Sequence, residues 1–187
     1  MKKILMIAAA VLFISSGSVK SSATQRAKGL PATDLISAIR KRYALINRSL
    51  PKYRMVKKEL SGFSTEGGEL AAYFDGTAIV KIATVNLGEI GRSVEDFYYR
   101  DEKLIFVYRR QETYDAPFSG KVARKTENRF YFSDGKLIRW IDENAKQVAP
   151  GASEYLKKQS EYERASKLLI EGSRSRKTII EAPEGNS

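Results

Sequence analysis

The predicted fold is decided by the stretch Phe130-Tyr131-Phe132-Ser133-Asp134-Gly135-Lys136-Leu137-Ile138-Arg139-Trp140-Ile141. An Asp-Gly pair between an aromatic run and an apolar run is the strongest short-range signal for a β-hairpin. A two-residue turn of this type requires positive φ at both central positions. Gly adopts positive φ without steric cost, and Asp tolerates it better than most residues. The stretch therefore predicts two antiparallel strands joined by a tight turn.

Two earlier segments repeat this pattern in weaker form, around Asp75-Gly76 and around Asp101-Glu102. Each has aromatic residues before the turn and aliphatic residues after it, which suits a pleated sheet. Glu accepts positive φ less readily than Gly, so we expect the middle turn to be longer or of another type. The copies are unevenly spaced, which favours a repeated hairpin over a solenoid. Three hairpins in series predict an antiparallel sheet.

Two segments with helical periodicity flank this sheet. The first is predicted from Asp34 to about Asn47, with Thr33 as its N-cap, and the second from Ser153 to about Ile170. Both are amphipathic. We predict an α+β fold, in which an antiparallel meander of about six or seven strands, built from three aromatic hairpins, has an amphipathic helix at each end. The apolar helix positions are Leu35, Ile39, Tyr43 and Ile46 in the first, and Tyr155, Tyr162 and Leu169 in the second.

The N-terminus has the pattern of a secretory signal peptide: two lysines, an apolar run from Ile4 to Ile14, and small residues up to Ala23. The apolar run is too short to span a bilayer comfortably, although an uncleaved membrane anchor is the alternative interpretation. We predict a signal peptide over residues 1–23, one α+β domain over 24–172, and a disordered tail over 173–187. Because the chain has no Cys, it has no lipobox cysteine and no disulfide. The expected location is periplasmic or secreted.

The predicted mature chain is basic. The full sequence has a formal net charge of +11, and removal of Lys2, Lys3 and Lys20 leaves +8. An exported protein rarely meets nucleic acid, so the expected anionic partners are lipid headgroups, cell-wall polymers or an acidic protein. A surface charge that only promotes solubility is the simpler alternative. We expect no nucleic acid partner and no transmembrane segment in the mature chain.

The composition excludes several kinds of chemistry. With no His and no Cys, the sequence cannot form a Ser-His-Asp triad, a thiol nucleophile or an ordinary zinc site. We therefore predict no catalytic residue, no metal and no cofactor, and a protein that is not an enzyme. The alternative is a hydrolase that uses carboxylates such as Glu66, Glu69 and Glu89. Acidic residues next to Gly in loops are also common in ordinary turns.

Strict alternation of side chains predicts that both faces of the sheet are apolar. Two helices can cover one face, and the second face then needs the curved sheet itself, a loop, a partner or a ligand as its cover. Complete internal cover, an oligomer interface and a binding groove remain open. Our functional hypothesis is a non-catalytic protein that binds an apolar or amphipathic envelope ligand, and the alternative is a protein-interaction module such as an inhibitor or assembly partner. The first face is predicted to carry Phe97, Tyr99, Leu104, Phe106, Tyr108, Phe130, Phe132, Leu137 and Ile141, and the second, Val107 and the candidate ligand-binding residues Tyr98, Ile105, Tyr131, Ile138 and Trp140.

Four phrases of the sequence, taken together, resemble a group of small exported bacterial proteins of unknown function that is common in Bacteroidetes-like genomes. The resemblance covers about Ile36 to Val148. It implies a shared fold of a helix and a sheet, and it provides no catalytic residues that could be carried over. The phrases span residues 39–47, 64–69, 88–91 and 129–140.

Overall fold

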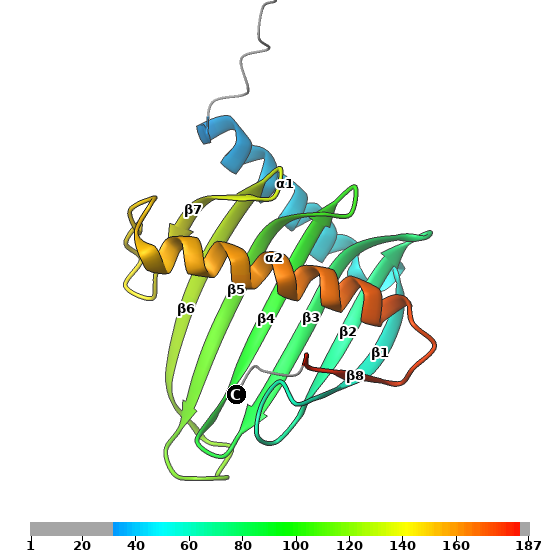
Figure 1. The fold of residues 1–187 in the computed structure, drawn as a ribbon, viewed down its shortest axis with the longest axis vertical. Helices are drawn as coiled ribbons and strands as arrows, with labels where there is room; N and C mark the ends of the chain where they lie inside the picture. The colour runs from blue at the N-terminus through cyan, green and yellow to red at the C-terminus, as the bar shows by residue number, and fades with distance from the viewer. Residues whose placement is uncertain (1–31, 184–187) are drawn as a thin grey trace, which may run out of the picture.

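An eight-stranded, mostly antiparallel sheet forms the middle layer of the computed structural model, which describes residues 32–183 (Figure 1). The strand order is β7-β6-β5-β4-β3-β2-β1-β8, so the first seven strands form a meander. The predicted α+β class with an antiparallel sheet is confirmed, and the sheet has one strand more than the largest predicted number. The strands are β1 (Arg54–Ser61), β2 (Gly68–Asp75), β3 (Ala78–Gly88), β4 (Gly91–Arg100), β5 (Lys103–Tyr114), β6 (Val122–Ser133), β7 (Lys136–Ile141) and β8 (Ile179–Glu181).

The turns β2–β3, β4–β5 and β6–β7 lie at the same end of the sheet, because every second connection of a meander returns to that end. Each turn has two central residues. The prediction for the middle turn is wrong: Asp101 and Glu102 both adopt positive φ, 49° and 60°, in a tight turn. In the first turn Asp75 pairs with Ala78, so the central residues begin at Gly76, one position later than predicted.

Each of these three hairpins contains a β-bulge shortly after its turn. The register of paired residues shifts by one, which leaves Val80, Ile105 and Ile138 as the extra residues. A bulge places two consecutive side chains on the same side of the strand, so strict alternation fails beyond it. The face predicted from the sequence is therefore wrong for Phe106, Val107, Tyr108, Trp140 and Ile141.

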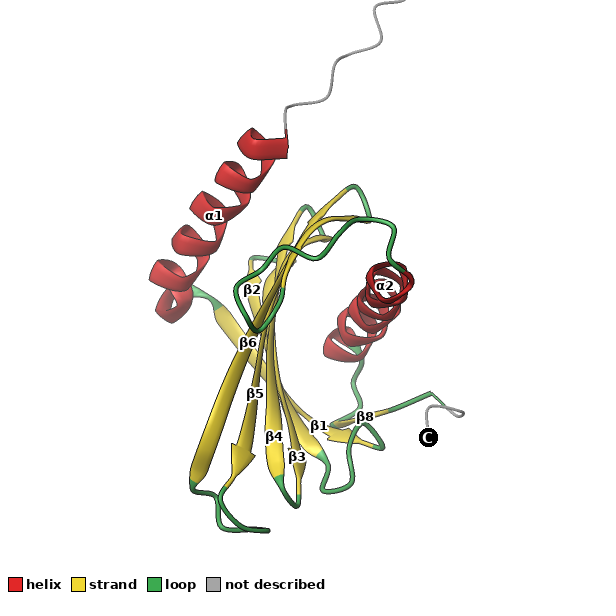
Figure 2. Cartoon of the chain, turned by 90° about the vertical axis from the view of Figure 1, so that its left-hand side faces the viewer, coloured by secondary structure: helices red, strands yellow, loops and turns green. Residues whose placement is uncertain are grey.

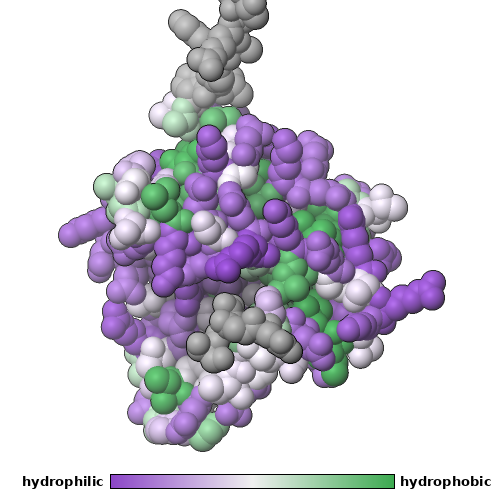
Figure 3. Space-filling view, viewed as in Figure 1, coloured by the Kyte–Doolittle hydropathy of each residue, from purple (hydrophilic) through white to green (hydrophobic). Residues whose placement is uncertain are grey.

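The two helices, α1 (Ala32–Ser49) and α2 (Ser153–Arg174), lie on opposite faces of the sheet (Figure 2). The expectation that both helices can cover one face is thus wrong for this molecule. A short 3₁₀ helix, η1 (Leu50–Lys52), connects α1 to β1. Neither helix of residues 32–183 has a stretch long and apolar enough to cross a bilayer. The outer surface of α2 is hydrophilic in Figure 3, as expected for an amphipathic helix.

Each face of the sheet has its own apolar core beneath the helix that lies on it. The α2 side is the larger, and α2 contributes Tyr155, Tyr162 and Leu169 to it. On the α1 side, α1 contributes Ile36, Ile39 and Ile46. The sheet residues of the α2-side core include Leu70, Phe74, Ile82, Phe97, Tyr99, Val107, Phe130, Phe132 and Trp140, and those of the α1-side core are Val80, Tyr98, Ile105, Phe106 and Tyr131.

At the end of the sheet opposite the three turns, the strands extend beyond both helices (Figures 1 and 2). There the α2 side of the central strands becomes polar, with Asn86, Ser93, Glu95 and Gln111 in place of aromatic residues. Polar side chains need no cover from a helix because they can bond to water. The apolar pattern that predicts two covered faces is therefore a property of only half of the sheet.

The C-terminal segment differs from the predicted disordered tail over residues 173–183. Helix α2 continues to Arg174, and β8 pairs in parallel with β1. Ile180 is buried in the α2-side core, where a Cβ added to Gly172 would lie 2.5 Å from its Cδ1 atom, so a larger residue at this position would displace Ile180. The end of the tail, residues 184–187, and the predicted signal peptide, residues 1–23, lie outside the described residues.

Candidate functional site

The structure brings together four of the five predicted ligand-binding residues. Tyr98, Ile105 and Tyr131 are buried beneath α1, and Ile138 packs against them. Trp140 lies on the other side of the sheet, in the α2-side core, because the bulge at Ile138 reverses the alternation of β7. Its indole N–H donates a hydrogen bond to Asn128, and only 8% of the residue is exposed.

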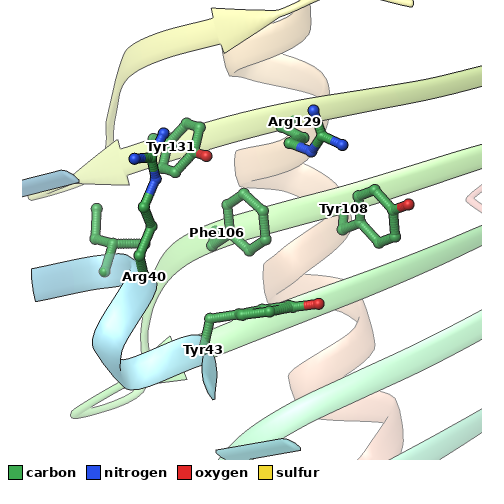
Figure 4. A pocket seen from close by; sticks show the side chains of 7 residues that line it. Arg40, Tyr43, Phe106, Tyr108, Arg129 and Tyr131 are labelled. Atoms are coloured by element: carbon green, nitrogen blue, oxygen red, sulfur yellow. The ribbon is translucent and has the colours of Figure 1, made fainter. Parts of the chain in front are cut away.

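A cavity of about 210 Å³ remains between α1 and strands β5 and β6, which we call the α1 pocket (Figure 4). Its walls are mainly aromatic. The ring centroid of Phe106 lies 5.5 Å from that of Tyr43 and 4.8 Å from that of Tyr131. Helix α1 contributes Ile39, Arg40 and Tyr43, β5 contributes Phe106 and Tyr108, and β6 contributes Arg129 and Tyr131.

Guanidinium groups flank the α1 pocket. Figure 4 shows Arg40 beside Tyr131 and Arg129 toward Tyr108, with the ring of Phe106 between them. The Cζ atom of Arg40 lies 6.0 Å from the centroid of the Tyr131 ring, and that of Arg129 lies 5.8 Å from the centroid of the Tyr108 ring. Within residues 32–183, no carboxylate lies within 4.0 Å of Arg40. The pocket thus combines an apolar interior with a positive rim.

A small polar network fixes one side of this rim. Arg129 forms an ion pair with Glu127 at 3.0 Å. The neighbouring Tyr108 hydroxyl, together with Arg129, lowers the pKa of Glu127 below its ordinary value. Burial raises the pKa of Tyr108 to about 12, so Tyr108 is a neutral donor at neutral pH. A third basic residue, Arg110, lies 5.8 Å from the Tyr108 ring, and its Nε atom is buried without a partner among the described residues.

The C-terminal half of α1 is held to the sheet by hydrogen bonds between Asn47 and side chains around a buried ion pair of β3 and β4. Lys81 and Asp96 lie 3.0 Å apart, and their side chains are 8% and 14% exposed. Asn47 of α1 accepts hydrogen bonds from the Tyr98 hydroxyl at 3.1 Å and from Lys81 at 3.5 Å. Burial raises the pKa of Tyr98 well above its ordinary value, which keeps its hydroxyl protonated as a donor. One wall of the α1 pocket is therefore anchored by hydrogen bonds as well as by apolar packing.

The three carboxylates of the hydrolase alternative lie on separate elements. Glu69 is on β2, Glu66 is in the loop before β2, and Glu89 is in the β3–β4 turn, and all three are exposed. Burial instead raises the pKa of Glu95, which lies on the α2 side of β4. No group of three or more acidic residues in the described part of the chain is arranged to hold a metal ion.

Sequence reasoning missed most residues of the α1 pocket. It placed Phe106 and Tyr108 on the other face, and it assigned no binding role to Arg40, Tyr43 or Arg129. The available signal is that Arg40 and Tyr43 lie on adjacent turns of the predicted helix, with Tyr43 on its apolar face. Comparison of the chain with protein-family models, with curated proteins and with solved structures finds no match.

Proposed function

We propose that this protein is a non-catalytic, exported binding protein that holds an amphipathic anion in the α1 pocket. The observation that carries the proposal is an aromatic cavity of about 210 Å³ with Arg40 and Arg129 at its rim. An apolar cavity with a few charged groups at its edge is the usual form of a site for a small amphipathic ligand.

The interior fits a small apolar group. A cavity of about 150 Å³ is enough to hold a benzene molecule, so the α1 pocket is large enough for a ring or a short acyl segment. The rings of Tyr43, Phe106 and Tyr131 would contact this group on three sides. Each methylene group removed from water contributes about 0.8 kcal/mol.

The rim fits a carboxylate or a phosphate. Guanidinium groups bind both anions through paired N–H donors, and binding is stronger where water is partly excluded. Arg40 has no competing carboxylate within residues 32–183, whereas Arg129 is partly neutralised by Glu127. Arg40 would therefore make the main contact with the anion, and Arg129 would orient it. Amphipathic carboxylates and phosphates are abundant in the bacterial envelope, the location that the N-terminal sequence predicts.

The test is isothermal titration calorimetry with three ligands that share one chain: octanoate, octyl phosphate and octanol. The protein is the chain produced without residues 1–23. We expect both anions to bind at least about tenfold more tightly than octanol, since a hydrogen bond to a charged group contributes about 1.5–3 kcal/mol. The Arg40→Gln variant should lose most of this preference while it retains binding of octanol.

A matched control is Arg124→Gln, because Arg124 is an exposed residue of the same strand as Arg129 but does not line the pocket. It should bind all three ligands as the wild type does. Equal affinity for the anions and octanol, or an equal loss in the Arg124 and Arg40 variants, would refute the proposed site. The two anions distinguish a fatty-acid type of ligand from a phosphorylated lipid type.

A further inference from the structure

A second hollow, of about 470 Å³, lies on the other face of the sheet, at the end that α2 does not cover. We call it the Glu95 pocket. Strands β3, β4 and β5 form its floor, and the loop between β1 and β2 forms one wall. This loop is fixed to β3, because the N–H of Leu87 donates to the carbonyl of Gly67 at 2.9 Å and the N–H of Glu66 donates to the carbonyl of Leu87 at 3.3 Å. The volume is within the usual range for small-molecule sites, about 300–1,000 Å³.

The charges on the floor of the Glu95 pocket cancel. Glu95 accepts a hydrogen bond from the Tyr162 hydroxyl at 3.2 Å, and Arg109 lies 3.6 Å from the same carboxylate oxygen. Arg109 in turn donates to Gln111 at 3.3 Å. The side chains of Glu95 and Arg109 are 17% and 33% exposed, so both retain some access to the hollow. A neutral polar ligand fits this pair better than a charged one.

Two buried polar atoms at this end of the sheet have no hydrogen-bond partner among the described residues: the side-chain oxygens of Thr84 and Asn86. Asn86 also lines the pocket. A buried acceptor without a partner destabilises the folded protein, and a ligand donor that bonds to it would relieve this. Asn86, Ser93 and Gln111 together provide both donors and acceptors, which is the combination that a hydroxyl group satisfies.

The wall adds an apolar surface to this polar floor. Phe63, on the β1–β2 loop, lines the pocket beside Ser64. An aromatic ring next to donors and acceptors can contact the C–H groups of a sugar ring while the floor bonds to its hydroxyls. An extended peptide fits less well, because the backbone groups of the floor strands are already paired with each other in the sheet.

From this combination we propose that the Glu95 pocket binds a neutral saccharide, through contact with Phe63 and hydrogen bonds to Asn86, Glu95 and Arg109. The site is separate from the α1 pocket and does not depend on the proposed function of that pocket. The sheet lies between them, so each can be tested with its own ligands and variants.

The experiment is a titration of the ¹⁵N-labelled chain, without residues 1–23, with maltotriose and chitotriose at millimolar concentrations, followed by NMR. We expect at least one sugar to shift the backbone amides of the β1–β2 loop and of Asn86, Ser93 and Gln111, with no shifts at Tyr43 or Tyr131. Phe63→Ala and Glu95→Gln should each weaken binding by about fivefold or more, as expected for the loss of one contact. The control Lys125→Gln, an exposed residue of β6 on the other face that lines neither pocket, should bind as the wild type does.

Melting temperatures of all variants separate loss of binding from loss of folding, and Glu95→Gln retains an acceptor for the Tyr162 hydroxyl. The proposal is overturned if neither sugar produces shifts, or if the shifts lie outside the pocket. It is also overturned if a neutral tripeptide, trialanine, shifts the same amides and neither sugar does. The last result would assign the pocket to peptides instead.

Discussion

Replacement of Tyr162 tests how α2 is attached to the sheet. Tyr162 is buried at the centre of the α2-side core, and its ring centroid lies 4.7 Å from Phe130, 5.9 Å from Phe97 and 6.2 Å from Phe132. Its hydroxyl donates to Glu95. One side chain thus contributes both apolar packing and a buried hydrogen bond, and two variants, Tyr162→Ala and Tyr162→Phe, separate the two contributions.

The size of the Tyr162→Ala effect follows from burial. An aromatic side chain buries about 150–250 Å², which at about 25 cal/mol per Å² corresponds to about 4–6 kcal/mol. Truncations of buried aromatic residues cost about 3–5 kcal/mol, so we expect a loss of about 4 kcal/mol. For a protein of this length, that lowers the melting temperature by about 8–16 °C. Tyr162→Phe removes only the hydroxyl and should cost about 1–3 kcal/mol.

The assay is urea unfolding followed by the fluorescence of Trp140, which is the only Trp in the sequence and packs 5.2 Å from Phe130 in the same core. The control is Leu156→Ala, because Leu156 lies on α2 but is 54% exposed. It should change the free energy of unfolding by less than about 0.5 kcal/mol. The reasoning is refuted if Tyr162→Ala costs less than about 1 kcal/mol, or if both Tyr162 variants cost the same.

Three further predictions concern charge and backbone. Burial raises the pKa of Glu95, so Glu95 stabilises the folded state below its unfolded pKa of about 4.3, and this stabilisation is lost as the pH rises through the folded pKa. Urea titrations at several pH values should show that Glu95→Gln loses this pH dependence of stability. A pH profile of the variant that runs parallel to that of the wild type would contradict the prediction. Lys81→Met should cost about 3–5 kcal/mol by leaving Asp96 buried and unpaired, and the double variant with Asp96→Leu should recover more than half of that loss, whereas additive losses would exclude coupling. Glu102→Gly should raise the free energy of unfolding by about 1 kcal/mol, because Glu102 has a φ of 60° and its exposed ion pair with Arg174 contributes little. Thr77→Gly, at a position without positive φ, should not stabilise the protein. Equal effects of the two variants in thermal melts would disprove the explanation.

Turn chemistry and periodicity were sufficient to predict the fold class, the three turn positions to within one residue, and both helices. These features depend on neighbours in the sequence: Asp134-Gly135 specifies its own turn, and Tyr155 and Tyr162 show which side of α2 is buried. Strand β8 could not be found in this way. Its short apolar run is stabilised by pairing with β1, which is distant in the sequence. It is also stabilised by the packing of Ile180 against Gly172, which arises only in the folded structure.

The candidate site was harder to predict because β-bulges leave no local signal in an apolar strand. Leu104, Ile105, Phe106 and Val107 are all apolar, so no pattern shows that Ile105 is the extra residue. The same uncertainty placed Trp140 on the wrong face. The helix patterns also do not predict which helix lies on which face of the sheet. Each pattern shows that one side of its helix is buried, but both faces of the sheet are apolar and could accept either helix.

The most direct test of the proposed function is an NMR titration with octyl phosphate that observes the Nε–H groups of arginine side chains together with the indole N–H of Trp140. The proposal predicts that the signals of Arg40 and Arg129 shift with the backbone amides of Tyr43 and Phe106, and that the Trp140 signal stays unchanged on the opposite side of the sheet. If the arginine signals stay unchanged while octyl phosphate binds, or if Trp140 shifts in their place, the ligand is not held in the α1 pocket and the proposed function is wrong.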